Sequence, residues 1–90
     1  MRAVCEEMSV RATDFTAGPG GVMTDEVGVV TGDLTLKTTV DSGGAVTQFV
    51  QYQQADEWYR LTGAPDRIPD GGDIEALHTA TVTRLARGEN

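Results

Sequence analysis

Apolar and polar residues alternate along most of the chain up to position 63, with short glycine-rich or polar interruptions. Alternation with a period of two is typical of a β-strand that buries one of its faces. The predicted strands span residues 8–15, 22–30, 34–40, 45–54 and 58–63. The alternation is most regular in the third of these segments and weakest in the second.

The alternation also assigns side chains to the two faces of each predicted strand. In the first strand, one face consists of Met8, Val10 and Ala12, and the other of Ser9, Arg11 and Thr13. In the second strand, the apolar face consists of Met23, Val27 and Val29. In the third strand, one face consists of Leu34, Leu36, Thr38 and Val40.

The segment DSGG, residues 41–44, is a strong hairpin signal, because glycine readily adopts the positive φ of tight hairpin turns. The strand that returns from it has apolar residues on both faces. Val46, Val50 and Tyr52 fall on or near one face, and Phe49 lies on the other. This pattern predicts a central strand, or a second surface that a partner covers.

A single helix is predicted over residues 74–87. Asp73 can cap its N-terminus through its carboxylate, and Gly88 can end it. The segment 64–72 contains two prolines and is predicted to be an irregular connector. At about 100° per residue, the stripe that we expect to be buried consists of Ile74, Leu77, Thr81, Val82 and Leu85.

Together these elements predict an α+β fold, with a hairpin-rich antiparallel sheet of four to five strands and one C-terminal helix packed on one face. We expect a single domain over residues 8–88, because a chain of 90 residues is long enough for one. Residues 1–7 are expected to be disordered or an extension from an upstream start site. That would place Cys5 outside the fold.

The chain is acidic, with 14 acidic and 7 basic residues and a net charge of −7. Such a surface repels nucleic-acid phosphates and anionic lipids, so we expect neither direct nucleic-acid binding nor membrane binding. A basic protein partner, or an uncharged one, fits this charge better. With 39% hydrophobic residues and 11 glycines, the core is expected to be thin, which favours a homodimer.

Cysteine use and the N-terminal pattern favour a cytoplasmic protein. A single cysteine excludes an internal disulfide, and residues 1–7 lack the apolar segment of a signal peptide. No apolar run approaches the ~20 residues that span a bilayer. Six arginines against one lysine favour a GC-rich bacterial coding sequence.

No constellation of residues predicts a catalytic, cofactor or metal site. His78, the only histidine, falls inside the apolar stripe of the helix, so we expect it to be packed or at an interface. Ser9 and Ser42 lack the surroundings of a catalytic serine. Cys5 lies beside two glutamates, which would raise the pKa of its thiol and make it a poor nucleophile.

Two other segments lack the spacing of known binding motifs. Asp66, Asp70 and Asp73 do not match a calcium-binding loop, and helix capping explains Asp73 better. The glycine-rich segment 17–21 lacks the Lys and Ser/Thr of a phosphate-binding loop. We expect it to be a flexible connection.

The last predicted strand holds the best candidate contact residues. It places Trp58 and Arg60 on the face opposite Tyr59 and Leu61, and Phe49 shares that face if the strands pair. Tryptophan and arginine dominate the energetics of protein interfaces. Two interpretations stay open, because the rings of Phe49 and Trp58 either fill the core or form an interface.

These observations lead to a first hypothesis and an alternative. The first is a small, acidic, non-enzymatic protein-interaction module, homodimeric, that acts as an adaptor, inhibitor or regulator through Phe49, Trp58 and Arg60. The alternative is a small-molecule-binding or catalytic domain with a pocket between helix and sheet lined by Tyr52, Tyr59 and His78. A third idea, mimicry of DNA, requires a regular double row of carboxylates.

Overall fold

The computed structural model describes residues 9–68 and 73–88, so the predictions for Met8, Cys5 and the rest of residues 1–8 lie outside it. The elements within the described residues are β1 (Ser9–Thr16), β2 (Val22–Thr24), β3 (Gly28–Val30), β4 (Asp33–Val40), β5 (Val46–Tyr52), β6 (Tyr59–Arg60) and α1 (Ile74–Ala86). Four strands form an antiparallel sheet in the order β1-β4-β5-β6, and β2 and β3 form a small second sheet. The predicted α+β class is therefore confirmed.

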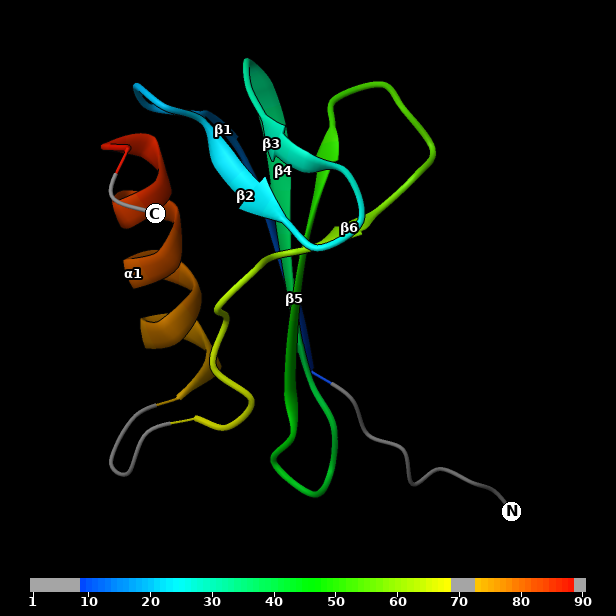
Figure 1. The fold of residues 1–90 in the computed structure, drawn as a ribbon. Helices are drawn as coiled ribbons and strands as arrows, with labels where there is room; N and C mark the ends of the chain where they lie inside the picture. Colours follow the sequence, from blue (N-terminus) through cyan, green and yellow to red (C-terminus); the bar gives the residue numbers. More distant parts are fainter. Residues whose placement is uncertain (1–8, 69–72, 89–90) are drawn as a thin grey trace.

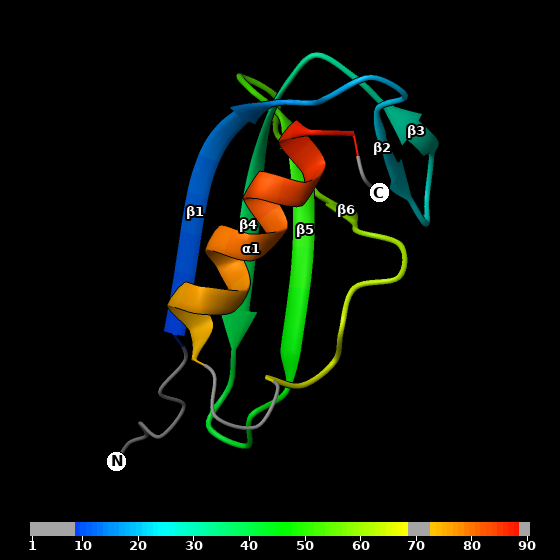
Figure 2. The same cartoon turned by 90° about the vertical axis from the view of Figure 1, so that its left-hand side faces the viewer.

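The helix covers one face of the four-stranded sheet. Figure 2 shows α1 in front of the sheet, and the helix contacts β1 and β4. Figure 1 views the sheet edge-on, with α1 on one side and the loop between β5 and β6 on the other, while the hairpin β2–β3 crosses one end of the sheet. The two faces of the sheet therefore have different surroundings.

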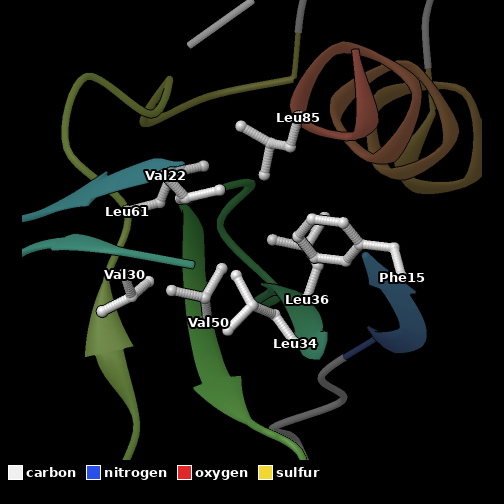
Figure 3. Close-up of a cluster of buried hydrophobic side chains, with 8 residues drawn as sticks. All are labelled: Phe15, Val22, Val30, Leu34, Leu36, Val50, Leu61 and Leu85. Atoms are coloured by element: carbon white, nitrogen blue, oxygen red, sulfur yellow. The ribbon is translucent and has the colours of Figure 1, made fainter. Parts of the chain in front are cut away.

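The apolar core lies between the helix, the sheet and the hairpin β2–β3. Its buried side chains, which Figure 3 shows converging from all three, are Phe15, Val22, Val30, Leu34, Leu36, Val50, Leu61 and Leu85. Removal of these side chains from water provides the main driving force that holds the three parts together.

The hairpin of β4 and β5 has the predicted faces and turn. Leu36 pairs with Val50, and both are fully buried on the helix side. Asp41 Oδ1 accepts hydrogen bonds from the backbone N–H groups of Gly43 and Ala45, which closes the turn. β5 lies between β4 and β6, so its prediction as a central strand is confirmed.

The prediction for the first strand assigned its faces in reverse. Phe15 is the core residue of β1, and Arg11 and Thr13, on the same face, bond to residues of the helix. Val10 is 46% exposed on the opposite face, together with the exposed Ala12. Val10 and Phe15 lie on opposite faces of the strand, so only one of them can face the helix. Phe15 does so, because its large ring buries more apolar surface than the Val10 side chain would.

The segment 22–30, predicted as one strand, is a hairpin. The Thr24 hydroxyl donates to the Gly28 carbonyl at 2.7 Å, and Gly28 has a φ of 76°, which L side chains rarely adopt. The predicted apolar face is also wrong, because Met23, Val27 and Val29 are exposed by 40%, 53% and 50%. The residues that alternate with them enter the core instead.

The last predicted strand, 58–63, is divided between two partners. Tyr59 and Arg60 pair with β5 as β6, while Leu61 forms a bridge with Thr24 of β2. The Thr62 backbone N–H donates to the Met23 carbonyl at 3.1 Å. This short segment therefore joins the small hairpin to the edge of the large sheet.

The helix matches its prediction at both ends. Asp73 caps it, since its Oδ1 accepts from the Ala76 backbone N–H at 2.8 Å, and Arg87 forms the C-cap. The buried helix residues are His78, Thr81 and Leu85. The predicted stripe is therefore confirmed at Thr81 and Leu85, whereas Ile74, Leu77 and Val82 are only half-buried. Among the described residues, no helix is long and apolar enough to cross a membrane.

The glycine-rich segment after β1 packs on the C-terminal end of the helix. The Gly18 backbone N–H donates at 3.0 Å to the Leu85 carbonyl, which also accepts from the Gly88 backbone N–H at 3.2 Å. A Cβ at Gly18 would overlap the Gly88 nitrogen and would lie 2.6 Å from the Arg87 carbonyl carbon. The expected flexible connection is in fact a docked loop.

Replacement of Gly18 should therefore destabilise the fold. Gly18→Ala places a methyl group in the backbone of the helix end, and we expect a loss of about 2 kcal/mol. This corresponds to a fall in the melting temperature of roughly 10 °C for a domain of this size, measurable by circular dichroism. Gly43→Ala is the matched control, because its nearest neighbour is Asp41 Oδ1 at 3.5 Å. Equal melting temperatures of the two variants would contradict the close approach.

Candidate functional site

The face of the sheet opposite α1 carries no second layer of helix or sheet among the described residues, and the loop between β5 and β6 lies on that side (Figure 1). The strand register fixes which side chains share this open face. A central row crosses all four strands and consists of Ala12, Lys37, Phe49 and Arg60.

Lys37 lies between two aromatic rings on this face. Its Nζ is 5.5 Å from the centroid of the Phe49 ring and 4.3 Å from that of the Trp58 ring. Trp58 comes from the end of the loop that precedes β6. A cation–π contact of this kind contributes about 0.5–1 kcal/mol at an exposed site. The lysine therefore holds the loop tryptophan to the sheet.

The central row is positive in a chain that is acidic overall. An ion pair joins Arg11 Nε and Glu75 Oε1 at 2.6 Å, on the helix side of the sheet. The side chains of Lys37 and Arg60 form no ion pair within residues 9–68 and 73–88, although the Arg60 backbone N–H donates to Glu26 Oε1 at 2.8 Å. Asp14 lies on the open face, where the hydroxyl of a neighbouring threonine donates to it. The charge of this row thus differs from the net charge of −7.

The structure brings together the three residues that the sequence indicated as a contact surface. Phe49 and Arg60 are cross-strand partners, and Trp58 shares Lys37 with Phe49. The rings of Phe49 and Trp58 are both half-buried. Sequence reasoning missed Lys37. The available signal was the hairpin turn predicted at residues 41–44, because a hairpin closed there places Lys37 opposite Phe49.

The three residues of the alternative pocket do not come together. His78 contacts Thr13 on β1 and Thr38 on β4, whereas Tyr59 lies on β6, two strands beyond β4, or about 10 Å at the usual strand spacing. The Tyr59 hydroxyl donates to Glu57 Oε1 at 2.9 Å, and this hydrogen bond raises the pKa of Tyr59. Tyr52 is 41% exposed at the end of β5.

His78 belongs instead to a buried network of hydrogen bonds between the helix and the sheet. Its Nε2 lies 2.8 Å from Thr13 Oγ1, and its Nδ1 lies 2.8 Å from Thr38 Oγ1. Gln48 Nε2 donates to the hydroxyl oxygens of Thr38 and Thr81 at 3.0 and 3.1 Å. His78 is 3% exposed, so its prediction as a packed residue is confirmed.

The hydrogen bonds determine which nitrogen of the His78 ring carries the proton. Thr81 donates its hydroxyl to a helix carbonyl one turn earlier, so its oxygen accepts from Gln48. Thr38 also accepts from Gln48, and its own hydroxyl hydrogen then points to Nδ1 of His78. The proton is therefore on Nε2, which donates to Thr13. A ring in this form offers Thr13 no basic nitrogen.

Burial favours the neutral form of this histidine. Desolvation lowers the pKa of His78 below its usual 6.5, because an imidazolium loses its hydration between helix and sheet. Glu75 acts in the opposite direction and Arg11 in the same direction as burial. Because these two residues form an ion pair, their opposite effects on the pKa of His78 partly cancel.

One atom of the network has no partner. Gln48 is 1% exposed, and its Oε1 accepts no hydrogen bond from the described residues. The reverse orientation of the amide would leave an N–H unpaired, and orphaned buried donors are rarer than orphaned acceptors. The sequence signal for this residue was a polar side chain at an inward position of β5, between Val46 and Val50.

The remaining candidate residues form no site in the described part of the chain. Ser42 lies in the hairpin turn and Ser9 at the start of β1, and threonines occupy both ring nitrogens of His78. Asp73 serves as the helix cap, while Asp70 lies outside the described residues. Residues 9–68 and 73–88 contain no cluster of three or more potential metal ligands.

Comparison with known proteins adds no functional information. No protein-family model matches the chain, and neither the curated proteins nor the solved structures gave a match. Any assignment of function therefore depends on the two features described above, the open face and the buried network.

The buried network predicts a large loss of stability for one volume-preserving substitution and little change for another. Thr38→Val leaves a Gln48 N–H and the His78 Nδ1 unpaired, and we expect a loss of about 3 kcal/mol in the free energy of unfolding. Gln48→Met leaves both threonine hydroxyls with their acceptors and removes the orphaned carbonyl. We expect a change of less than about 1 kcal/mol. Urea denaturation measures both, and equal losses would contradict the network.

The lowered pKa of His78 predicts that acid destabilises the fold. The unfolded chain takes up a proton on His78 near pH 6.5, while the folded chain does not. The contribution of neutral His78 to the free energy of unfolding is therefore fully present above this pH and is lost as the pH falls through the folded-state pKa. Urea denaturation between pH 7.5 and 5.5 should show this loss in the wild type. His78→Gln should remove the dependence in this window. A wild-type stability that rises on acidification would contradict a lowered pKa of His78 as the cause.

Proposed function

We propose that the chain is a non-enzymatic protein-interaction module that associates with a second copy of itself through the open face of the sheet. One observation carries this proposal. Lys37 lies between Phe49 and Trp58, with Arg60 in the same row, on a face that no helix or sheet of the described residues covers. Aromatic and arginine side chains at the centre of a surface are typical of interface hot spots.

A second copy suits this face because the central row is self-complementary. A two-fold axis parallel to the strands, between β4 and β5, places β1 of one copy opposite β6 of the other. Ala12 then faces Arg60 of the second copy, a small residue against a long one, and Lys37 faces Phe49 of the second copy. Both pairs occur twice, as in any contact between identical surfaces. Aligned packing of two sheets provides the geometry.

Charge also supports contact through this face. Two chains with a net charge of −7 each repel one another, and the repulsion is smallest where the contact surfaces carry the fewest acids. The central row contains two cations and no carboxylate, while Asp14 lies beside it on the same face and Glu26 contacts the Arg60 backbone. The positive row fits a basic partner less well than the sequence suggested. The role as adaptor, inhibitor or regulator and the cytoplasmic location are further parts of this proposal.

The alternative, a ligand pocket near His78, has weaker support. Two threonine hydroxyls occupy the ring nitrogens, and the ring is 3% exposed. Tyr52 and Tyr59 lie along other parts of the sheet. These observations favour a structural role for the histidine.

Trp58→Ala should abolish self-association. We expect the wild type to have twice its chain mass of 9.6 kDa in light scattering on a size-exclusion column, and the variant to have the chain mass, because the variant loses the ring that positions Lys37. Val29→Ala is the matched control, since Val29 is 50% exposed on the small hairpin, away from the central row. The control should remain a dimer.

A second substitution keeps the test valid if Trp58→Ala unfolds the chain. Thr47 pairs with Thr39 next to the central row, and Thr47→Arg adds bulk and charge to the open face without removing any core contact. It should also yield a folded monomer, as circular dichroism can verify. A monomeric wild type, or a Thr47→Arg variant that still dimerises, would exclude the open face as the contact surface between copies.

A further inference from the structure

The orphaned carbonyl oxygen of Gln48 stands next to a hydroxyl whose hydrogen bonds depend on the charge of His78. In the neutral state, Thr38 donates its only hydroxyl hydrogen to His78 Nδ1 and accepts from Gln48 Nε2. Gln48 Oε1 is buried without a partner among the described residues. The network therefore contains one unused acceptor within the same amide group that binds Thr38.

Protonation of His78 reverses one of these hydrogen bonds. The added proton sits on Nδ1, which changes from an acceptor to a donor, so the Thr38 oxygen must accept from it. The Thr38 hydroxyl hydrogen then needs a new acceptor. A half-turn of the Gln48 amide about its terminal bond, a torsion with two nearly equivalent orientations, brings Oε1 to the position of Nε2, 3.0 Å from Thr38 Oγ1.

We propose that protonation of His78 and inversion of the Gln48 amide are one coupled event, which reverses the hydrogen-bond direction through Thr38 and weakens the attachment of the helix to the sheet. One proton enters from solvent and no other group changes charge. After inversion, Gln48 Oε1 accepts from Thr38, the hydrogen bond that Gln48 Nε2 donated to Thr81 is broken, and Nε2 becomes the orphaned atom. A buried unpaired donor is less favourable than the unpaired acceptor that it replaces.

The charged groups around His78 act weakly in this event. Glu75 lies one turn earlier on α1 and favours protonation, while Arg11 on β1 opposes it, and the two are ion-paired. The helix-facing residues of β4 and β5 are uncharged along the network, and Tyr52 lies at the far end of β5. Burial and the reversal at Thr38 therefore govern the transition.

The experiment is a titration of the full chain, labelled with ¹⁵N, followed by nuclear magnetic resonance from pH 8 to pH 5. The ring nitrogens of His78 should show the Nε2–H form at neutral pH. On acidification, the side-chain NH₂ signals of Gln48 should move with the same midpoint as the ring, and backbone amides of α1 should exchange faster with solvent. An Nδ1–H ring at neutral pH, or Gln48 signals that do not follow the ring, would overturn the proposal.

Gln48→Met tests the coupling by the direction in which the His78 midpoint moves. If the amide inverts, the protonated state loses an acceptor for Thr38, and the midpoint falls by roughly half to one pH unit. If the amide stays fixed, the substitution removes a competing donor from Thr38, and the midpoint rises. A rise would therefore overturn the proposal, and an unchanged midpoint would overturn it equally.

Thr38→Val is the matched control for the relay. It leaves His78 and Gln48 in place and removes the hydroxyl that connects them. The Gln48 signals should then no longer follow the His78 titration. If they still follow it in a folded Thr38→Val variant, the two residues respond to a general change of the fold, and the relay through Thr38 is excluded.

Discussion

A single helix has to cover a sheet with two faces, and the environment of most side chains follows from this constraint. α1 has 13 residues and a length of about 20 Å, enough to lie along β1 and β4 on one side only. Every strand must therefore divide its residues between a face that is buried under the helix and a face that is not. The division is sharpest where neighbours differ most, as at Lys37 on the open face and Thr38 at 0% exposure beneath the helix.

The contact between helix and sheet changes its character along the helix. Near the C-terminal end, Leu85 points into the apolar core to which Phe15 also belongs, as Figure 3 shows. One and two turns earlier, Thr81 and His78 meet the sheet through hydrogen bonds. An apolar contact tolerates small displacements of a helix, whereas matched donors and acceptors fit in one position only. We interpret the network as the feature that fixes where the helix lies, at the cost of one unpaired oxygen.

The fold could be predicted where local and global preferences agree. The helix cap at Asp73, the hairpin turn at 41–44 and the alternation of β4 and β5 each depend on a few neighbouring residues, and the structure confirms them. The faces of β1 could not be read correctly, because they depend on where Phe15 finds its core partners. The hairpin in 22–30 was hidden because valines flank its turn and imitate a continuous strand.

The candidate site could also be predicted only in part. Phe49, Trp58 and Arg60 could be grouped by residue type and strand parity, but Lys37 required the register of two strands at once. The threonines and the glutamine around His78 are ordinary residues at alternating positions. Only their convergence from β1, β4, β5 and α1 makes a network, and no spacing in the sequence encodes that convergence.

The open face and the buried network lie back to back on the same two strands. Lys37 and Thr38 are consecutive on β4, and Gln48 and Phe49 are consecutive on β5, each pair pointing to opposite sides. Such an arrangement could transmit a change in the core to the surface only if the backbone between the two residues moved. Inversion of an amide about its own side-chain bond needs no such movement. The paired strands therefore insulate the open face, and we expect association and the state of His78 to be independent of one another as long as the register of β4 and β5 is intact.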